Sequence, residues 1–301
     1  MPNIYAIAGG KGGIGKSVVS ILLAQAFSFD GKSTVLVDAD LGGANLHTLL
    51  GINYPRATLI DFLTKRVKSI NDVLLLTKDK NIRMISGAGE VLGTANLKWS
   101  VRQKLVRNMK TLSADNVIMD LGAGSSFNVI DFFLAVENHI MVVSPEPTAL
   151  QNAYMFLKAC IQRLLYLKFY KYVSIKKQLN RFMFPGNKNA ITTVHELIER
   201  VEPRSAKLSL AIGKAVNNFR PHLIVNLVDD QSESLKYHSA IKTTAKKYLN
   251  VEIQFLGTVY RNPQVMQIIK SNKSLLEIKP GVNNYPLTKI KSALYKELIA
   301  Y

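Results

Sequence analysis

The chain has few of the residues that build disulfide frameworks or membrane spans. Among its 301 residues there is a single cysteine, Cys160. One cysteine rules out a disulfide framework and a cysteine-based metal cluster within one chain, and it fits a reducing compartment. The longest apolar runs are too short to span a bilayer, and no secretory leader precedes the first expected strand. With 48% hydrophobic residues, we expect a globular cytoplasmic protein with a large core.

Acidic residues are also scarce. The chain has 39 Lys and Arg against 21 Asp and Glu, which gives a formal net charge of +18. The segment 147–195 contains no Asp or Glu at all. Such an excess of positive charge favours polyanions: nucleic acid, an anionic membrane surface or an acidic partner. A lysine-rich composition that only aids solubility is the alternative interpretation.

Within this acid-free segment, basic and aromatic residues are interleaved. They are Lys158, Arg163, Lys168, Lys171, Lys176, Lys177, Arg181 and Lys188, with Tyr154, Phe156, Tyr166, Phe169, Tyr170, Tyr172, Phe182 and Phe184. We expect the first half to be helical and the second half, around 184–187, to be a loop. Residues 158–190 would form an insertion in a single domain that covers 1–301. The alternative to a binding surface is a buried helix with a solvated lysine face and an ordinary loop.

Short apolar runs alternate with helical patterns along the chain. The expected strands are 3–8, 34–37, 83–85, 117–119, 140–143, 223–225 and 255–259. The expected helices include 17–29, 59–63 and 95–112. This alternation predicts an α/β fold with a mostly parallel central sheet and helices on both faces. Ligands of such folds bind at the carboxyl ends of the strands, after which we expect Lys16, Asp40, Asp120, Glu146 and Asn226.

A glycine-rich loop joins the first expected strand to the first expected helix. The stretch GKGGIGKS matches the pattern G-x-x-x-x-G-K-[ST]. Glycines let successive N–H groups face a phosphate, and the helix start adds its positive dipole end. Lys16 is expected to reach the β- and γ-phosphates, and the Ser17 hydroxyl to bind Mg²⁺. The candidate nucleotide-binding residues are Gly10, Lys11, Gly12, Gly13, Ile14, Gly15, Lys16, Ser17, Val18 and Asn226.

Carboxylates follow two of the expected strands. Asp38 and Asp40 come after 34–37, and Asp120 comes after 117–119. A lone Asp after a strand is more often a helix cap or turn residue. Three of them beside a phosphate loop favour a catalytic site in which carboxylates hold Mg²⁺ or orient the attacking water. The candidate metal ligands are Ser17, Asp40 and Asp120.

These motifs resemble those of one protein family. AGGKGGIGKS resembles the deviant Walker A loop of the MinD/ParA ATPases, in which an extra lysine precedes the second glycine pair. VLVDADLGGANLHTLLG resembles the segment that follows, while VIMDLGAGSSFNVIDFFL and MVVSPEPTALQNAY resemble the FlhG/FleN flagellar-number regulator branch. The resemblance covers most of the chain. It implies a P-loop ATPase that binds ATP or ADP with Mg²⁺ and forms a homodimer with ATP between the subunits.

The resemblance also implies roles for the candidate catalytic residues. Lys11 is the signature lysine, which crosses the dimer interface to the phosphates of the partner's nucleotide. Lys16 is the phosphate lysine of its own loop. Asp40 positions the attacking water with Asp38 behind it, and Asp120 is the Walker B carboxylate.

Further from the loop, the resemblance implies contacts to the partner subunit and to the base. Glu146 and Asn152 fall where the family makes dimer contacts, and Asn226 matches the asparagine that reads adenine. Tyr260 and Asn262 depart from the family pattern, which commonly has a proline and an acidic residue near the base. That departure leaves the base selectivity open.

The expected function is an ATP-dependent switch that regulates the placement or number of a cellular structure, such as flagella, through a protein partner of unknown identity. The alternative is a ParA-like ATPase that binds DNA non-specifically through 158–188. Recruitment by the same segment to an anionic membrane, at the inner membrane face, is a third hypothesis. For the apolar stripe of 287–301, we expect packing on the core rather than membrane insertion.

Overall fold

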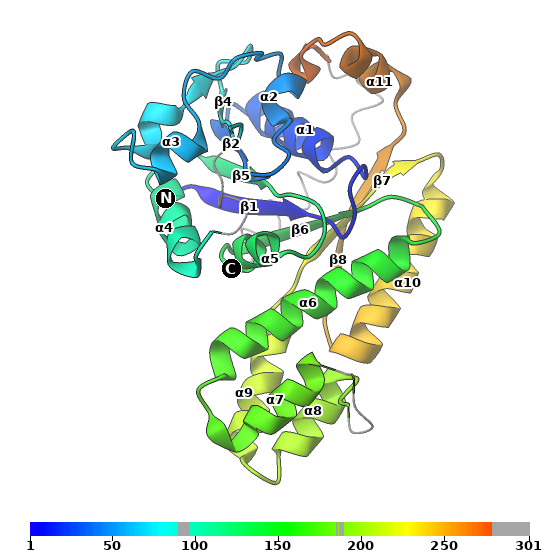
Figure 1. The fold of residues 1–301 in the computed structure, drawn as a ribbon. Coiled ribbons are helices and arrows are strands. Elements are labelled where there is room, and N and C mark those ends of the chain that lie inside the picture. Colours follow the sequence, from blue (N-terminus) through cyan, green and yellow to red (C-terminus); the bar gives the residue numbers. More distant parts are fainter. Residues whose placement is uncertain (90–96, 185, 187–189, 279–301) are drawn as a thin grey trace.

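The computed structural model describes residues 1–89, 97–184, 186 and 190–278, and they form an α/β fold around one sheet (Figure 1). The strand order is β3-β4-β2-β5-β1-β6-β7-β8. Neighbouring strands are parallel except β3 and β4, which are antiparallel. The strands are β1 (Asn3–Ala8), β2 (Thr34–Asp38), β3 (Leu75–Leu76), β4 (Ile82–Ile85), β5 (Asn116–Asp120), β6 (Asn138–Val143), β7 (His222–Val228) and β8 (Gln254–Tyr260). The predicted fold is thus confirmed.

Helices cover both faces of the sheet, because successive residues of the central strands bury their side chains on opposite sides. In β1, Ile4 and Ala6 belong to one hydrophobic cluster, and Tyr5 and Ile7 belong to the other. The face of Tyr5 is covered by α1 (Lys16–Phe29), α2 (Leu46–Leu49), α11 (Pro263–Lys270) and the 3-10 helix η4 (Leu275–Glu277). The face of Ile4 is covered by α3 (Leu59–Leu63), η1 (Ile70–Val73), α4 (Trp99–Met109), α5 (Phe127–Leu134), α6 (Ala149–Phe169) and α10 (Gln231–Leu249).

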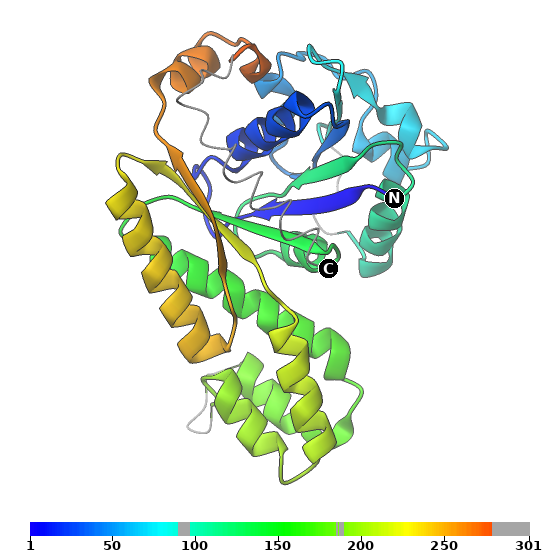
Figure 2. The ribbon, with the colours of Figure 1, turned by 180° about the vertical axis from the view of Figure 1, so that it is seen from behind.

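The second half of α6 leaves the sheet and enters a helical lobe (Figures 1 and 2). The lobe is completed by η3 (Val173–Ile175), α7 (Lys176–Met183), α8 (Val194–Val201) and α9 (Ala206–Asn217). Its core includes the buried side chains Leu165, Phe169, Ile175, Leu179, Phe182, Val194, Leu197 and Val201. No helix in the described part of the chain is long and apolar enough to cross a bilayer.

Some sequence-based expectations need correction. Residues 176–183 form α7 instead of belonging to a loop, because Leu179 and Phe182 recur at helical spacing and pack into the lobe core. Asn226 lies inside β7 and not after it. Within the described residues, the helix expected over 95–112 spans only Trp99–Met109. The stripe of 287–301 lies outside the described residues.

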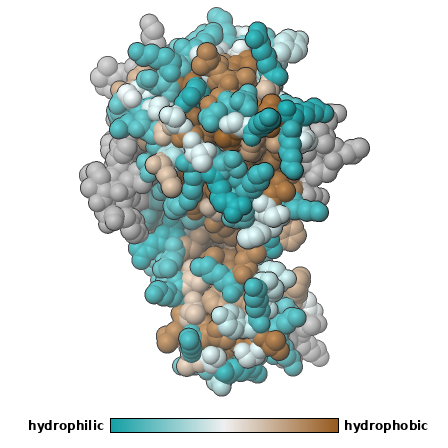
Figure 3. Space-filling view, turned by 90° about the vertical axis from the view of Figure 1, so that its left-hand side faces the viewer, coloured by the Kyte–Doolittle hydropathy of each residue, from teal (hydrophilic) through white to brown (hydrophobic). Residues whose placement is uncertain are grey.

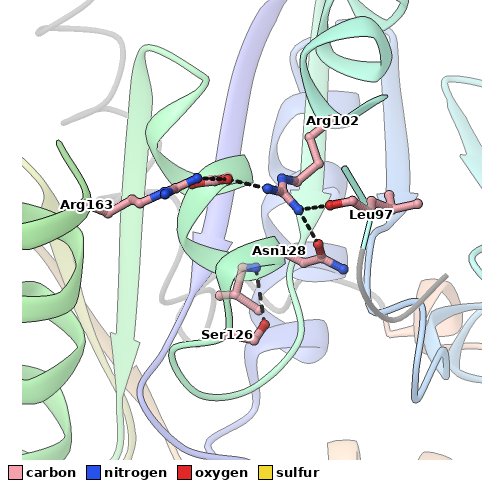
Figure 4. A network of polar contacts seen from close by, with 7 residues as sticks. Leu97, Arg102, Ser126, Asn128 and Arg163 are labelled. Carbon is pink, nitrogen blue, oxygen red and sulfur yellow. Dashed lines mark hydrogen bonds and ion pairs between the residues drawn. The ribbon is translucent and has the colours of Figure 1, made fainter. Parts of the chain in front are cut away.

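A buried ion network ties three helices together beside the sheet (Figure 4). Asp131 of α5 accepts hydrogen bonds from Arg102 of α4 at 2.5 Å and from Arg163 of α6 at 2.7 and 2.9 Å. The side chains of Asp131 and Arg102 are only 1% and 6% exposed. Arg102 also donates to the carbonyl of Leu97 and to Asn128. One carboxylate therefore balances two guanidinium groups, that of Arg102 buried and that of Arg163 partly buried.

Removal of the central carboxylate should destabilise the protein strongly. We expect Asp131→Ala to lower the free energy of unfolding by about 3–5 kcal/mol, because both arginines lose their counter-charge while one stays buried. Urea unfolding measures the difference. Glu137→Ala is the matched control, since Glu137 pairs with Lys110 at the surface and its loss should cost about 1 kcal/mol or less. Equal costs for the two variants would contradict the interpretation.

Candidate functional site

The phosphate loop lies at the carboxyl end of a central strand. Residues 9–15 connect β1 to α1, and β1 is flanked in the sheet by β5 and β6. The N–H of Gly124, in the segment after β5, donates to the carbonyl of Gly9 at 3.2 Å. In this class of fold, the first turn of the helix and the strand ends on both sides surround the ligand. The sequence-predicted loop thus stands where the fold binds phosphates.

Asn226 of β7 braces the loop from one side. Its Nδ2 donates to the carbonyl of Ile14 at 2.8 Å, and the side chain is 2% exposed. Gly15 follows with a φ of 81°, in the left-handed region that favours glycine. A Cβ at Gly15 would also overlap Nδ2 of Asn226. The asparagine expected to read adenine therefore already holds the loop through its side chain.

The loop contacts α6 on its other side. A Cβ at Gly10 would overlap the backbone carbonyl of Asn152, in the first turn of α6. Gly10 is required here because its backbone packs directly against that of the helix. The loop is thus held between β7 and α6, and its backbone packs directly against the start of α6.

Lys16 and Asp120 form the buried, charged centre of the site. They are 9% and 3% exposed. Burial lowers the pKa of Lys16, opposed by the charges of Asp120 and Asp40. Burial raises the pKa of Asp120 to about 6, opposed by hydrogen bonds from Ser17 and Ser20 and by the charge of Lys16. A buried carboxylate that shares a hydroxyl with the loop matches the oxygen ligands that Mg²⁺ prefers, directly or through water.

Ser20 is a residue of the candidate site that the sequence analysis missed. Its Oγ donates to Asp120 at 3.1 Å and to the carbonyl of Lys16 at 3.0 Å. Ser20 lies three residues after Ser17, so the two hydroxyls share one face of α1. The three-residue spacing of the two serines was the signal in the sequence that could have identified Ser20.

Asp38 holds the turn after β2. Its Oδ1 accepts from the N–H of Asp40 at 3.2 Å, and its Oδ2 accepts from the N–H of Leu46 at 3.0 Å. The residue pairs with Asp120 across the sheet and is 1% exposed. Burial, followed by the charge of Asp120, raises the pKa of Asp38 to about 7. Through these two hydrogen bonds, Asp38 positions the backbone of Asp40 and Leu46.

Asp40, two residues after the end of β2, is more accessible than Asp38. It is half-buried, and its Oδ1 lies 3.0 Å from where a Cβ on Gly122 would stand. Gly122 follows β5, so Asp40 projects across the strand end toward Asp120. The structure brings the three predicted aspartates together with Lys16. A carboxylate in this position can face a water that approaches a phosphate held by the loop.

Lys11 takes no part in this centre and lies on its outer rim. Its Nζ pairs with Oε2 of Glu146, after β6. The side chains are 46% and 40% exposed. Ser144 donates to the other oxygen, Oε1 of Glu146, at 3.1 Å. The two loop lysines thus have different surroundings, because Lys16 is buried among carboxylates and Lys11 stands at the surface.

A comparison with known families identifies this arrangement. The CobQ/CobB/MinD/ParA nucleotide binding domain matches residues 5–275. The chain belongs to this family. It is therefore a MinD/ParA-type nucleotide-binding domain, as the loop motif predicts.

Similar proteins agree with this assignment. The antiactivator FleN of Pseudomonas aeruginosa is 35% identical over 158 residues, 52% of this chain and 55% of FleN. The flagellum site-determining protein YlxH of Helicobacter pylori is 28% identical over 52% of this chain and 53% of YlxH. The chain thus spans about half the length of the curated relatives it matches. The septum site-determining protein MinD of Pyrococcus horikoshii, solved with Mg-ADP, shares the fold at a TM-score of 0.65 and 18% identity, over 99% of this chain and 98% of that one.

In protein free of nucleotide and Mg²⁺, the buried carboxylates should make stability fall as pH rises. The folded pKa of Asp120 is about 6 and its ordinary value 3.8, so the folded state binds the proton more tightly between those values. Relative to wild type, we expect Asp120→Asn to gain on the order of 3 kcal/mol in the free energy of unfolding from about pH 4 to about pH 7.

Urea unfolding of the nucleotide-free and Mg²⁺-free protein across this range measures the gain. Asp115→Asn is the control, because hydrogen bonds from Ser33 lower the pKa of Asp115. Its difference from wild type should stay constant between about pH 5 and about pH 8. A flat difference for Asp120→Asn as well would contradict the prediction.

The contact between Gly15 and Asn226 should appear as energetic coupling. Gly15→Ala introduces a left-handed alanine and a clash with the amide of Asn226. We expect Gly15→Ala to lower the free energy of unfolding by more than about 2 kcal/mol in the wild type. In an Asn226→Ala background it should lower it by only about 1 kcal/mol, because only the strain of the left-handed backbone remains. A double-mutant cycle by urea unfolding tests this. Additive costs would mean that the two residues do not constrain each other.

Proposed function

We propose that this chain is an ATP-dependent switch that binds and slowly hydrolyses ATP and dimerises in the ATP state. The observation that carries the proposal is the unequal placement of the two loop lysines. Lys16 is buried among carboxylates, where it can neutralise phosphates bound by its own loop. Lys11 is exposed at the rim, paired with Glu146. A lysine at the rim can reach a second nucleotide that a facing subunit presents.

The Lys11–Glu146 pair is weak enough to exchange. Pairs between exposed side chains contribute about 0–1 kcal/mol, since both ions stay largely hydrated. A triphosphate on a second subunit offers Lys11 more negative charge than one carboxylate does. Glu146 would then be free for contacts of its own with the partner subunit. The pair would keep Lys11 in place until a second nucleotide arrives.

Within one subunit, the proposed catalytic roles follow from the contacts. Lys16 and the N–H groups of the loop hold the phosphates, and Asp40 orients the water. Asp38 fixes the backbone of Asp40 through its hydrogen bond. Ser17, with Asp120 behind it, would hold Mg²⁺, which offsets the charge of the phosphates when bound.

Three substitutions separate binding, dimerisation and turnover. We expect Lys16→Ala to abolish ATP binding. Lys11→Ala should bind ATP but stay monomeric and lose at least about tenfold in turnover, because the cross-subunit charge is missing. Asp40→Ala should bind ATP and remain dimeric, because the water is no longer oriented. Light scattering with ATP and phosphate-release assays measure these outcomes.

Lys32→Ala is the control for the loss of an exposed lysine, since Lys32 lies by Asp115 on another part of the surface. It should match wild type in mass and turnover. A Lys11→Ala protein that hydrolyses ATP at the wild-type rate would refute the cross-subunit role.

For the cellular role, we propose regulation of the placement or number of a structure such as the flagellum. FleN is named an antiactivator and YlxH a flagellum site-determining protein, and the similarity to them supports this role. A ParA-like DNA-binding role is the second candidate, supported by the net charge of +18. Affinity capture with the ATP-bound Asp40→Ala dimer distinguishes them: flagellar regulators are expected, and recovery of DNA-partition proteins instead would overturn the flagellar role.

A further inference from the structure

One face of α7, in the helical lobe, is exposed although its opposite face is buried. Leu179 and Phe182 pack into the lobe core, at 2% and 0% exposure. The outer face carries the residues that we call the α7 stripe. They are Val173, Lys176, Lys177, Asn180, Arg181 and Phe184, at helical spacing. These residues line an open hollow of about 690 Å³.

The stripe combines apolar ends with a cationic centre. Val173 and Phe184 are 83% and 69% exposed, and both border the hollow. Figure 3 shows hydrophobic patches on the surface of this lobe. Between the two apolar side chains stand Lys176, Lys177 and Arg181. The stripe therefore offers apolar anchors at both ends and three positive charges between them.

No described carboxylate neutralises these cations. The acid-free segment 147–195 supplies none. On the adjacent α8, Glu196 bonds Arg200 at 2.6 Å, and Glu199 pairs with His195 at 3.1 Å. Glu196 and Glu199, the two carboxylates within α8, are thus engaged on their own helix. The charge of the stripe is left for a partner from outside the described chain.

The segment expected to be basic and aromatic divides into core and surface residues. Phe156, Phe169 and Phe182 are buried, as expected if the segment were a buried helix with a solvated lysine face. Tyr172 and Phe184 are exposed, and both belong to the short stretch around α7. The exposed basic and aromatic residues continue from the end of α6, at Tyr166 and Tyr170, to α7, and those around α7 border the hollow.

We propose that the α7 stripe is a docking surface for an acidic segment of a protein partner, with apolar side chains at each end of its acidic centre. Charge complementarity selects an acidic occupant. An eight-residue helix is about 12 Å long, which matches two to three turns of a partner helix. The hollow lies in the lobe beyond the sheet, so docking leaves the phosphate loop uncovered.

The shape of the surface favours a protein segment over DNA or a bilayer. Phosphate backbones are bound chiefly by cations and polar groups, which would leave Val173 and Phe184 without a function. A bilayer accepts apolar side chains that protrude, together with basic residues, whereas this surface is hollowed between its apolar ends. A peptide ridge fills the hollow and pairs with its charges at the same time.

Peptide selection on the full protein tests the proposal. From a random library of about 14-residue peptides, we expect enrichment of sequences with a cluster of Asp and Glu next to a large apolar residue. The double variant Lys176→Glu, Lys177→Glu should bind the selected peptide at least about tenfold more weakly. Val173→Asp should also weaken it, through the lost apolar anchor. Lys207→Glu, which reverses one exposed charge on α9 of the same lobe, is the control and should bind like wild type.

Each other outcome overturns the proposal. No enriched peptide, enriched peptides without acidic residues, or unchanged binding by the stripe variants would each refute it. Duplex DNA of about 20 bp and vesicles with about 30% phosphatidylglycerol are compared directly. Tighter binding of either, lost in the same variants, would assign the stripe to nucleic acid or lipid. ATP affinity of the stripe variants should equal that of wild type, which shows that they fold and separates this test from that of the proposed ATPase.

Discussion

The structure depends on one constraint, the tight passage of the chain from β1 through the phosphate loop into α1. At Gly9, Gly10 and Gly15 the loop has room for backbone but not for a side chain. Asn226 stands against Gly15 on one side, and the start of α6 stands against Gly10 on the other. The loop can therefore present its N–H groups to a phosphate only because the neighbouring elements fix its position. The sheet order supplies those neighbours by placing β6 next to β1 and β7 next to β6.

Electrostatics around the loop follow from the same packing. Burial holds Asp38 and Asp120 in a region where ionisation is costly, so their pKa values rise to about 7 and about 6. Lys16 is the cation near them, and its pKa is lowered by burial. In this site, ionised carboxylates and the lysine are poorly solvated. A bound cation would stabilise the carboxylates, and bound phosphates would stabilise the lysine. The charges of Lys11 and Glu146 do not carry this cost of burial, because both side chains are exposed to water at the rim of the site.

Local patterns in the sequence predicted the sheet and the loop, because short apolar strands and a glycine-rich phosphate motif are set by neighbouring residues. Contacts between distant segments were not predictable in this way. No pattern links Asp131 to Arg102 and Arg163, because that network exists only once three helices pack. The bond from Asn226 to the loop likewise depends on the pairing of β6 with β7. Helix α7 was missed although Leu179 and Phe182 recur at helical spacing, because the run is short and these side chains are buried only once α6 and α8 pack against it.

The long helix α6 gives these separate features a common geometry. It begins at Ala149, next to Glu146 and in contact with Gly10, and its 21 residues extend about 31 Å into the lobe. Arg163, near its middle, is fixed to α5 by Asp131. A helix held at one end by the phosphate loop, and anchored along its length by a buried ion pair, resists bending. Displacement of Glu146 by a facing subunit would therefore act on a rigid element, and the lobe with its α7 stripe stands at the other end of that element.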